Sequence, residues 1–550
     1  MSMMFCLAKC LPCGQPAGYH GPMLLTPGPS PVGRKLPDDD PFGLETNISE
    51  ASKGKKIIMC TAGSRGDIQP MVALACELQK SGFEVLVLSN SNHVDFIQKF
   101  SLKAQGTNFD FEEFFNNPEI AKVVGQGDFK RYMEAKVRVL RSDIASCFEK
   151  TFQAFKEYKP DLYICPLSDL PLGLMWGALF DVPCVTTCLA QIIFPSKVHP
   201  SLLNEPCFHY SCAWLSLTQY YSRNAQLVDV VVKEASMDAA TREFLVSFRA
   251  TMQRFTYDLL NPLGPCIFGV SGQIMPNPPD WTIDAHAPGF WVVSKKEQMK
   301  RFERQESGFG GKEVQLMAEF IKAGPPPVYM GWGSLTVGTA EAMMCLAARA
   351  LKFSGKRGIL LSGWAKLNPG MLAGQPDSQE LCDYLKKNVL IVDTAPHEWL
   401  FPQCAVTVHH GGAGTTVASL RSGKPVVVTP CFFDQFMYAD MVARLGCGMG
   451  MPQFQKVTPQ ALAAAILQCC NSTEIHMKAI QICDQLQSED GLVSSVEIID
   501  SFFATEVSSG SWKVKHDAKK EKLHELSKKT SFVDGLKFFA RVCCTAKPFG

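Results

Sequence analysis

VHHGGAGTTVASLRSGKPVVVTPCFFDQFMY, residues 408–438, is the stretch of this chain that decides its fold. It begins at the end of an apolar run and passes through His409 and His410 into a glycine-rich turn over residues 411–414. Thr415 and Thr416 follow, where a helix is expected. A strand, a glycine turn and a helix in this order direct backbone N–H groups to one place. A phosphate can bind there without clashing with side chains.

The second part of the stretch adds a place for a sugar. A strand expected over residues 425–429 leads into the adjacent pair Asp434 and Gln435. A carboxylate accepts hydrogen bonds, and a carboxamide both accepts and donates them, so the pair suits the hydroxyl groups of a sugar. Phosphate and sugar held by one continuous segment indicate a nucleotide-sugar donor.

The bulk properties of the chain limit its class. Its 550 residues exceed what one hydrophobic core usually fills, so two domains are expected. Hydrophobic residues make up 46% and charged residues 19%, and the net charge of +1 gives no reason to expect nucleic-acid binding. The 22 cysteines are scattered through expected strands and helices, which favours core thiols in a reducing compartment. The expected localisation is therefore cytoplasmic.

Short apolar runs alternate with helical patterns in both halves of the chain. Strands are expected over residues 55–63, 84–89, 161–165 and 183–189, and again over 328–332, 358–361, 389–392, 405–408 and 426–429. Helices are expected over residues 70–81, 129–158, 172–180, 340–352, 413–422, 435–445, 459–468, 474–487 and 494–505. This alternation predicts an α/β fold with two parallel sheets, each covered by helices, that face each other across a cleft. Ligands then bind at the carboxyl ends of the strands.

Composition predicts the following division of the chain. We expect a disordered leader over 1–54, an N-terminal domain over 55–270, an interdomain linker over 271–323, a C-terminal domain over 324–507 and a basic amphipathic tail over 508–550.

The two ends of the chain leave alternatives open. Cys6, Cys10 and Cys13 are candidates for palmitoylation, and the lack of acids before Asp38 fits an organelle transit peptide, although an unstructured leader is the expected outcome. Lysines beside aromatic residues in the tail fit peripheral contact with a membrane surface. The expected outcome is a charged tail that packs weakly on the surface of the protein, and membrane contact is the alternative.

The donor stretch resembles the signature of family 1 and family 28 glycosyltransferases of the GT-B fold. The likeness is closer to sterol glucosyltransferases and looser to bacterial antibiotic glycosyltransferases, and it covers about residues 55–505. It implies two Rossmann-like domains, the first for the acceptor and the second for the nucleotide sugar. The tryptophan that stacks on uracil in plant members would fall at Val392, so this part of the signature differs.

A second motif lies in the loop after the first strand, Gly63-Ser64-Arg65-Gly66-Asp67-Ile68-Gln69-Pro70. The sterol and antibiotic enzymes that it resembles carry Gly-Ser/Thr-Arg-Gly-Asp here, and plant relatives place their basic histidine at the spacing of Asp67. The resemblance implies that Asp67 removes the proton of the acceptor hydroxyl. The competing interpretation is that Asp67 caps a helix. Arg65 is a candidate for contact with the diphosphate or for a structural ion pair.

The donor site is expected to centre on His410, which the resemblance makes the hydrogen-bond donor to the diphosphate. His409 is its rival, but neighbours on a strand face opposite ways and the family pattern has the histidine directly before the glycines. The resemblance implies that Ser334, in the turn Gly331–Ser334, contacts the donor phosphate or ribose. The turn Ser362–Trp364 is expected to border the uridine. The expected donor-binding residues are Ser64, Arg65, Gly66, Ser334, Trp364, Gly411, Gly412, Gly414, Thr415, Thr416, Asp434 and Gln435.

The resemblance implies an inverting enzyme that moves glucose from UDP-glucose to the hydroxyl of a sterol or related lipid alcohol and forms a β-glucoside. Another hydrophobic acceptor, such as a terpenoid or a polyketide, and a non-catalytic binding or scaffold protein are the alternatives. The acceptor pocket is expected near residues 191–221, which are apolar and aromatic. No metal and no cofactor is expected, since UDP-glucose is the donor substrate.

Overall fold

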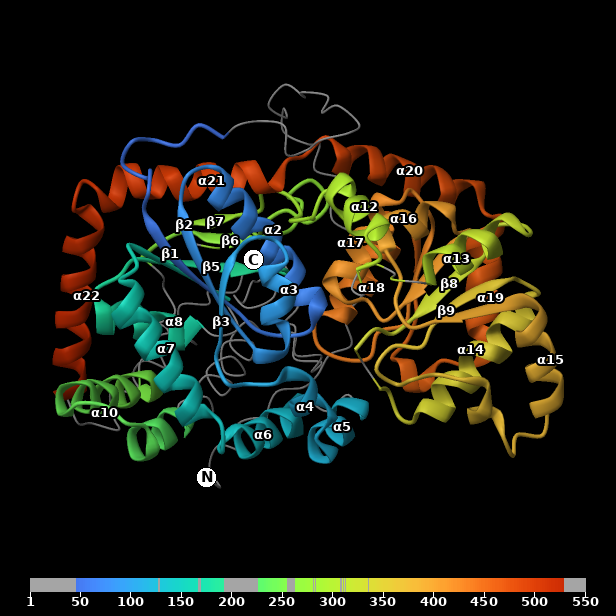
Figure 1. Ribbon diagram of the computed structural model, residues 1–550, viewed down its shortest axis with the longest axis horizontal. Coiled ribbons are helices and arrows are strands. Elements are labelled where there is room, and N and C mark those ends of the chain that lie inside the picture. Colours follow the sequence, from blue (N-terminus) through green and yellow to red (C-terminus); the bar gives the residue numbers. More distant parts are fainter. Residues whose placement is uncertain are drawn as a thin grey trace, which may run out of the picture. The chain divides into compact units, whose positions relative to one another are not determined.

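Two parallel β-sheets form the framework of the computed structural model (Figure 1). The structure describes residues 46–528 except 127–128, 167–169, 192–225, 255–262, 280, 282, 307–308, 310, 312 and 335. The predicted α/β class with two sheets is confirmed.

The N-terminal half is built on a sheet with the strand order β3-β2-β1-β4-β5-β6-β7. Its strands are β1 (Lys56–Thr61), β2 (Glu84–Ser89), β3 (Lys103–Gly106), β4 (Leu162–Pro166), β5 (Cys184–Cys188), β6 (Cys266–Phe268) and β7 (Ala285–His286). Its helices are α2 (Arg65–Lys80), α3 (Val94–Gln98), α4 (Phe111–Asn116), α5 (Pro118–Gly125), α6 (Phe129–Leu140), α7 (Ile144–Tyr158), α8 (Leu170–Phe180) and α10 (Ala239–Arg254).

The C-terminal half is built on a sheet with the strand order β10-β9-β8-β11-β12-β13. Its strands are β8 (Val328–Gly331), β9 (Gly358–Leu361), β10 (Val389–Val392), β11 (Val406–His409), β12 (Val426–Val428) and β13 (Gly448–Gly450). Its helices are α14 (Ala340–Ser354), α15 (Ser378–Asn388), α16 (His397–Leu400), α17 (Ala413–Arg421), α18 (Gln435–Leu445), α19 (Pro459–Asn471) and α20 (Thr473–Gln487).

Helix α2 begins five residues before the predicted start at Pro70. Proline is common in the first turn of a helix, so Pro70 is a natural predicted start. In the structure Ser64 precedes the first helical residue, and its backbone N–H donates to the Asp67 carboxylate at 2.8 Å. Because of this contact the helix begins at Arg65, and Pro70, which lacks an N–H group, lies inside the helix. The predicted helix over 129–158 is likewise interrupted, between α6 and α7.

The segment predicted as a linker, 271–323, differs from the expectation. Strand β7 pairs in parallel with β6 and completes the first sheet, and α12 (Lys295–Glu303) and α13 (Glu313–Lys322) follow. The many Pro and Gly residues of this segment predict loops, and strands as short as β6 and β7 leave no recognisable pattern in the sequence. The connection between the two sheets therefore begins after β7 and is shorter than the predicted linker.

The predicted end of the C-terminal domain at residue 507 also differs. Helix α21 (Gly491–Phe502) returns to the N-terminal half, where Val496, Ile499 and Phe502 join the core that contains Ile57. A π-helical turn (Phe503–Val507) continues into α22 (Ser511–Lys528), which runs down the edge of the N-terminal half and contacts α10 (Figure 1). The sequence could not show this return, because an apolar helix face does not identify the sheet that it covers.

The outgoing and returning chains cross at two glycines. A Cβ on Gly491 would lie 2.4 Å from the carbonyl carbon of Gly289, so neither chain has room for a side chain there. The crossing sets the path by which α21 reaches the N-terminal half.

Both termini of the described region pack on the body of the protein. In the predicted leader, Ile48 is buried and the Ser49 hydroxyl donates to Asp500 at 2.6 Å, so residues 46–54 belong to the fold. Residues 1–45 lie outside the described residues. In the predicted tail, Trp512 is buried and Lys520 donates to Asp181 at 2.9 Å, whereas residues 529–550 lie outside the described part.

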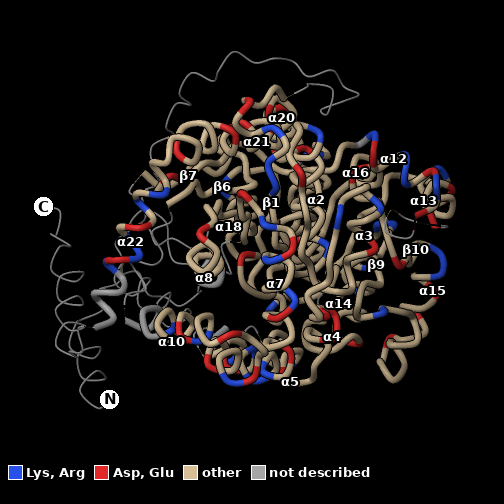
Figure 2. Tube along the Cα trace, turned by 60° about the vertical axis from the view of Figure 1, so that its left-hand side comes forward, with Lys and Arg blue, Asp and Glu red and all other residues tan. Residues whose placement is uncertain are grey.

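Helices α4 to α6 connect the two halves. Phe114, Ile120, Val123 and Ala135 belong to the same buried cluster as Trp332 of the C-terminal half. Acidic and basic residues are interspersed along the chain rather than gathered in one region (Figure 2).

Candidate active site

A cavity of about 1100 Å³ lies where the carboxyl ends of both sets of strands meet. Residues from both halves line it. Twelve of the fourteen predicted site residues are among them: Ser64, Arg65, Gly66, Asp67, Ser334, Trp364, His410, Gly412, Gly414, Thr415, Asp434 and Gln435. Gly411 and Thr416 are not. The two sequence motifs thus come together in one place, as the fold class predicts.

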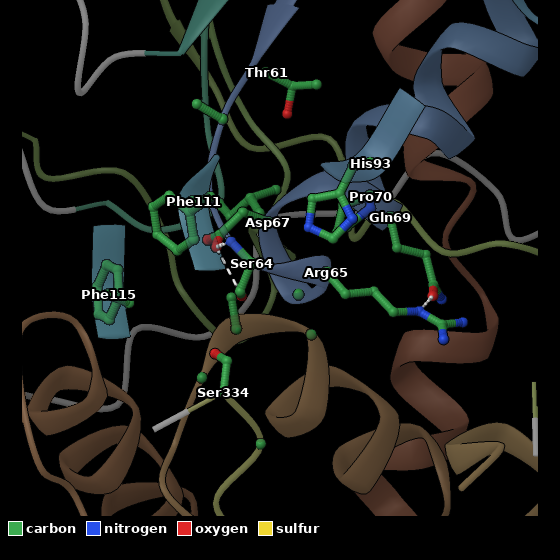
Figure 3. A pocket seen from close by; sticks show the side chains of 18 of the residues that line it. Thr61, Ser64, Arg65, Asp67, Gln69, Pro70, His93, Phe111, Phe115 and Ser334 are labelled. Atoms are coloured by element: carbon green, nitrogen blue, oxygen red, sulfur yellow. Dashed lines mark hydrogen bonds between the residues drawn. The ribbon is translucent and has the colours of Figure 1, made fainter. Parts of the chain in front are cut away.

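Asp67 is the third residue of α2, and its side chain faces the cavity (Figure 3). The Ser64 N–H and hydroxyl donate to the same oxygen, Oδ2, at 2.8 and 2.9 Å. The other oxygen, Oδ1, is left for a ligand. The walls of the cleft limit the solvation of the Asp67 carboxylate and raise its pKa although the residue keeps exposed surface, while the two bonds from Ser64 oppose the rise. Asp67 therefore takes part in capping the start of α2 through Oδ2, and Oδ1 plays no part in those two hydrogen bonds.

His410 lies in the cavity wall and His409 does not. His409 is fully buried, and its Nδ1 accepts the N–H of Gly411 at 3.0 Å, so its proton is on Nε2. His410 follows the end of β11, next to the turn after β8. Burial lowers its pKa to about 4, so the ring is neutral at physiological pH and donates through one N–H. The choice of His410 over His409 agrees with this geometry.

The glycines of the two motifs make room for close approaches. A Cβ on Gly412 would lie 2.4 Å from His410 Nε2, so any side chain there would displace the imidazole. A Cβ on Gly414 would lie 3.3 Å from the carbonyl oxygen of Gly66, which belongs to the other half. Gly66 and Gly414 therefore mark the place where α2 meets α17.

Asp434 faces the same cavity as Asp67. Burial and, to a lesser extent, the like charge of Asp67 raise its pKa to about 7, while a backbone hydrogen bond opposes the rise. Asp434 precedes α18, but its side chain does not cap that helix. The carboxylate is therefore directed to the cavity rather than used as a helix cap.

Gln435 has a structural role that the sequence did not reveal. Its Oε1 accepts the N–H groups of Cys431 and Phe432 at 2.8 and 3.0 Å. Within this turn Phe433 has a φ of +57°, a left-handed conformation that bulky side chains rarely adopt. Gln435 thus holds the strained turn that presents Asp434, and its NH₂ group is the part that remains to meet a ligand.

Thr416 and Gly411 do not line the cavity. The Thr416 hydroxyl is buried and donates to the Gly412 carbonyl at 2.9 Å, because this position is one turn further along α17. Gly411 has a φ of +91°, and a Cβ there would lie 2.7 Å from Val428 Cγ1. Both residues therefore shape the turn, and their contact with a donor stays a prediction.

Arg65 occupies an aromatic environment rather than an ion pair with an acid. Its guanidinium lies 5.0 Å from the ring centroid of Phe96 and 4.6 Å from that of Phe309, and Nε donates to Gln69 at 3.1 Å. Burial and the charge of Arg301 lower its pKa to about 10. Figure 3 shows Arg65 extending away from Asp67 on the opposite side from Phe111 and Phe115.

Several residues that line the cavity were missed. They are mainly aromatic or apolar: Phe109, Phe111, Phe115, Tyr132, Leu140, Ile144, Trp176, Leu189, Phe432 and Phe433. His93, Asp393 and His397 were missed as well. The run of phenylalanines over 109–115 was the one available signal. The segment expected to shape the acceptor pocket, 191–221, lies outside the described residues except for Gln191. The Gln191 side-chain NH₂ donates a hydrogen bond to Asn277 Oδ1.

Family comparisons match both halves of the chain. The glycosyltransferase family 28 N-terminal domain matches residues 57–165, and the erythromycin biosynthesis protein CIII-like C-terminal domain matches residues 368–499. Among solved structures, the calicheamicin glycosyltransferase CalG4 superposes with a TM-score of 0.55 at 14% identity, covering 82% of this chain and 99% of that one. The kitacinnamycin glycosyltransferase gives 0.53 at 18% identity, covering 81% and 98%. The chain therefore has the GT-B fold, with a glycosyltransferase-type domain in each half.

Curated relatives narrow the resemblance. The chain is 26% identical to the sterol 3-beta-glucosyltransferase of Saccharomyces cerevisiae over 84% of its length and 36% of that protein. It is 25% identical to a sterol 3-beta-glucosyltransferase of Arabidopsis thaliana over 80% of its length and 67% of that protein. It thus spans about a third of the yeast relative and two thirds of the plant one. The family resemblance read from the two motifs is confirmed.

Two further findings concern the described residues as a whole. Among the residues that the structure describes, none of the helices combines the length and apolar character that crossing a membrane requires. Within the same residues, no three His, Cys, Asp or Glu side chains gather as ligands for a metal ion.

Proposed function

We propose that this protein transfers glucose from UDP-glucose to the hydroxyl of a sterol or related lipid alcohol. The observation that carries the proposal is that Asp67 of one half and His410 and Asp434 of the other line a single cavity. The sterol 3-beta-glucosyltransferase names of the yeast and plant relatives support the substrate class.

The transfer begins with proton removal. Asp67 Oδ1 accepts the proton of the acceptor hydroxyl while that oxygen attacks the anomeric carbon of the sugar. A carboxylate with an ordinary pKa is a weak base toward an alcohol, and burial raises the pKa of Asp67 toward a useful value. The new C–O bond forms as the bond to the diphosphate breaks. A single displacement on an α-linked donor inverts the anomeric carbon and gives a β-glucoside.

The leaving diphosphate needs compensation for its growing negative charge. His410 donates one N–H to it, and the N-terminus of the nine-residue helix α17 contributes its backbone N–H groups and dipole. With a pKa of about 4, His410 supplies a hydrogen bond rather than a full positive charge. Thr415 and Ser334, both in the cavity wall, provide hydroxyl groups within the same region.

Asp434 accepts hydrogen bonds from hydroxyl groups of the sugar. Its pKa of about 7 in the ligand-free protein reflects burial first and the charge of Asp67 second, against one backbone hydrogen bond. Sugar hydroxyl groups add further donors, so binding of the nucleotide sugar stabilises the ionised form. The sugar then lies between the two carboxylates, with its anomeric carbon on the side of Asp67.

A single substitution tests the reaction. Asp67→Asn keeps the shape of the side chain and removes its basicity, so kcat should fall by about 10²-fold or more while UDP-glucose affinity stays nearly unchanged. UDP release and the mass of the product would be measured with UDP-glucose and a sterol panel. Asp95→Asn on α3, an exposed change outside the cavity, is the matched control.

The outcomes separate the alternatives. Unchanged turnover in Asp67→Asn would remove this residue from the role of base. Donor binding without turnover by the unaltered protein, across the whole acceptor panel, would instead support a non-catalytic binding protein. Product with a terpenoid or polyketide but not with sterols would keep the reaction and change the acceptor.

A further inference from the structure

A continuous run of aromatic rings lines one side of the cavity. It consists of Phe111, Phe115, Tyr132, Phe432 and Phe433, and we call it the aromatic wall. Successive ring centroids are 4.6, 6.5, 5.1 and 6.2 Å apart. The last ring directly precedes Asp434 in the chain. The wall therefore leads from the N-terminal half to the carboxylate assigned to the sugar.

The aromatic wall belongs to both halves of the protein. Phe111 and Phe115 lie on α4 and Tyr132 on α6, whereas Phe432 and Phe433 lie in the turn after β12. The join between the halves is the ring contact between Tyr132 and Phe432, at 5.1 Å with the ring planes inclined by 73°. A close backbone approach supports the same join, since a Cβ on Gly125 of α5 would lie 3.3 Å from the N of Gly338.

Four rings of the aromatic wall keep accessible surface. Phe111, Phe115, Tyr132 and Phe433 are only partly buried and line the cavity. Phe432 is buried, at 7% exposed, and belongs to the core cluster that also holds Phe114. Phe432 therefore supports the wall from behind, and the other four rings offer the surface that a ligand can contact.

The position of the wall relative to Asp67 indicates what binds there. Figure 3 shows Phe111 and Phe115 on one side of Asp67, with Arg65 and His93 on the other. The cationic and polar side suits the phosphate-bearing donor, and the aromatic side suits an apolar molecule. A hydroxyl at one end of that molecule would reach Asp67 while its body lay along the rings.

We propose that the aromatic wall binds the body of the acceptor and selects rigid, extended, fused-ring alcohols over small ones. The proposal rests on the function proposed above and specifies its acceptor side. Flat rings favour a flat apolar partner because contact area grows with the number of rings covered. Since the wall crosses the join between the halves, a long acceptor touches both halves, whereas a short alcohol touches only the part next to Asp67.

The test measures binding separately from turnover. Phe115→Leu and, independently, Phe111→Leu would be titrated with the fluorescent sterol dehydroergosterol, with UDP-glucose affinity determined in parallel. The dissociation constant for the sterol should rise about tenfold in each variant, and the affinity for UDP-glucose should stay within twofold. Phe244→Leu on α10, a partly buried ring outside the cavity, is the matched control and should leave both unchanged.

Turnover supplies the second readout. With UDP-glucose, kcat/KM for a sterol should fall about tenfold in Phe115→Leu, while that for a short-chain alcohol should change less than twofold. Equal losses for both acceptors, unchanged sterol affinity in both variants, or no sterol binding by the folded unaltered protein would overturn the proposal. If the unaltered protein binds the sterol through the wall but releases no UDP, the proposed function fails and the assignment of the wall stands.

Discussion

Replacing Asp434 by Asn should make the ligand-free protein more stable at alkaline pH, although it removes a group assigned to the sugar. Asp434 has a pKa of about 7 against an ordinary value of 3.8, a rise of about 3 units. Each unit corresponds to about 1.36 kcal/mol, so the upper limit is roughly 4 kcal/mol. Contact of the side chain with the solvent of the cavity screens the charge, and we expect about 1–2 kcal/mol.

The sign of the pH dependence follows from proton binding. Between about pH 4 and pH 7 the folded protein holds a proton on Asp434 that the unfolded chain has lost, so the free energy of unfolding falls as the pH rises. The loss is complete above the folded pKa. Asn carries no charge at any pH, so the Asp434→Asn variant escapes the loss. The difference between the two proteins should be absent at pH 4 and full at pH 8.

Thermal unfolding at pH 4, 6 and 8 measures this difference. We expect the midpoint of Asp434→Asn to exceed that of the unaltered protein by about 1–2 °C at pH 8. Asp440→Asn, an exposed change on the same helix, should show no such divergence. Asp67→Asn should lower the pKa of Asp434, because it removes a neighbouring negative charge. A midpoint that is equal or lower at pH 8 in Asp434→Asn would refute the account of a destabilising buried carboxylate.

Three further changes probe the rest of the site. His410→Ala should lower kcat by about 10²-fold in the UDP-release assay, because the diphosphate loses a donor, and an unchanged kcat would exclude that role. Gly414→Ala should lower kcat several-fold with little change in the thermal midpoint, since its Cβ would lie 3.3 Å from Gly66 O and hold the halves apart. Wild-type kcat in this variant would show that the approach is unimportant. Gln435→Leu should cost about 1–3 kcal/mol in stability by leaving two buried N–H groups unpaired, measured by urea unfolding, whereas a change in donor affinity alone would favour direct sugar contact.

The sequence was sufficient for the elements whose signals are local. Strand β2 over Glu84–Ser89 and helix α18 over Gln435–Leu445 coincide with the predictions, because apolar runs and the periodicity of 3.6 residues are properties of a short segment. Alternation along a strand, also a local rule, showed that His409 and His410 face opposite ways, and the family pattern then selected His410. In each case the deciding information lies within a few residues of the element.

The remaining features depend on contacts between distant segments. Nothing near Gln435 in the sequence shows that its oxygen serves Cys431 and Phe432, because that bond exists only in the folded turn. The contact of Tyr132 with Phe432 joins segments 300 residues apart in the sequence numbering. Sequence patterns describe one face of one segment, and they do not identify what that face meets.

The return of α21 and α22 has a practical consequence for chimaeric proteins. If the N-terminal half were exchanged between two related chains, two separate sheets would suggest that a single junction between them suffices. Here Val496, Phe502 and Trp512, from the far end of the chain, are part of the core of that half. In a chimaera with one junction, α21 and α22 of one parent would pack on the N-terminal core of the other parent. Successful recombination needs two junctions, one on either side of the Gly289–Gly491 crossing, so that each interior stays with its own parent.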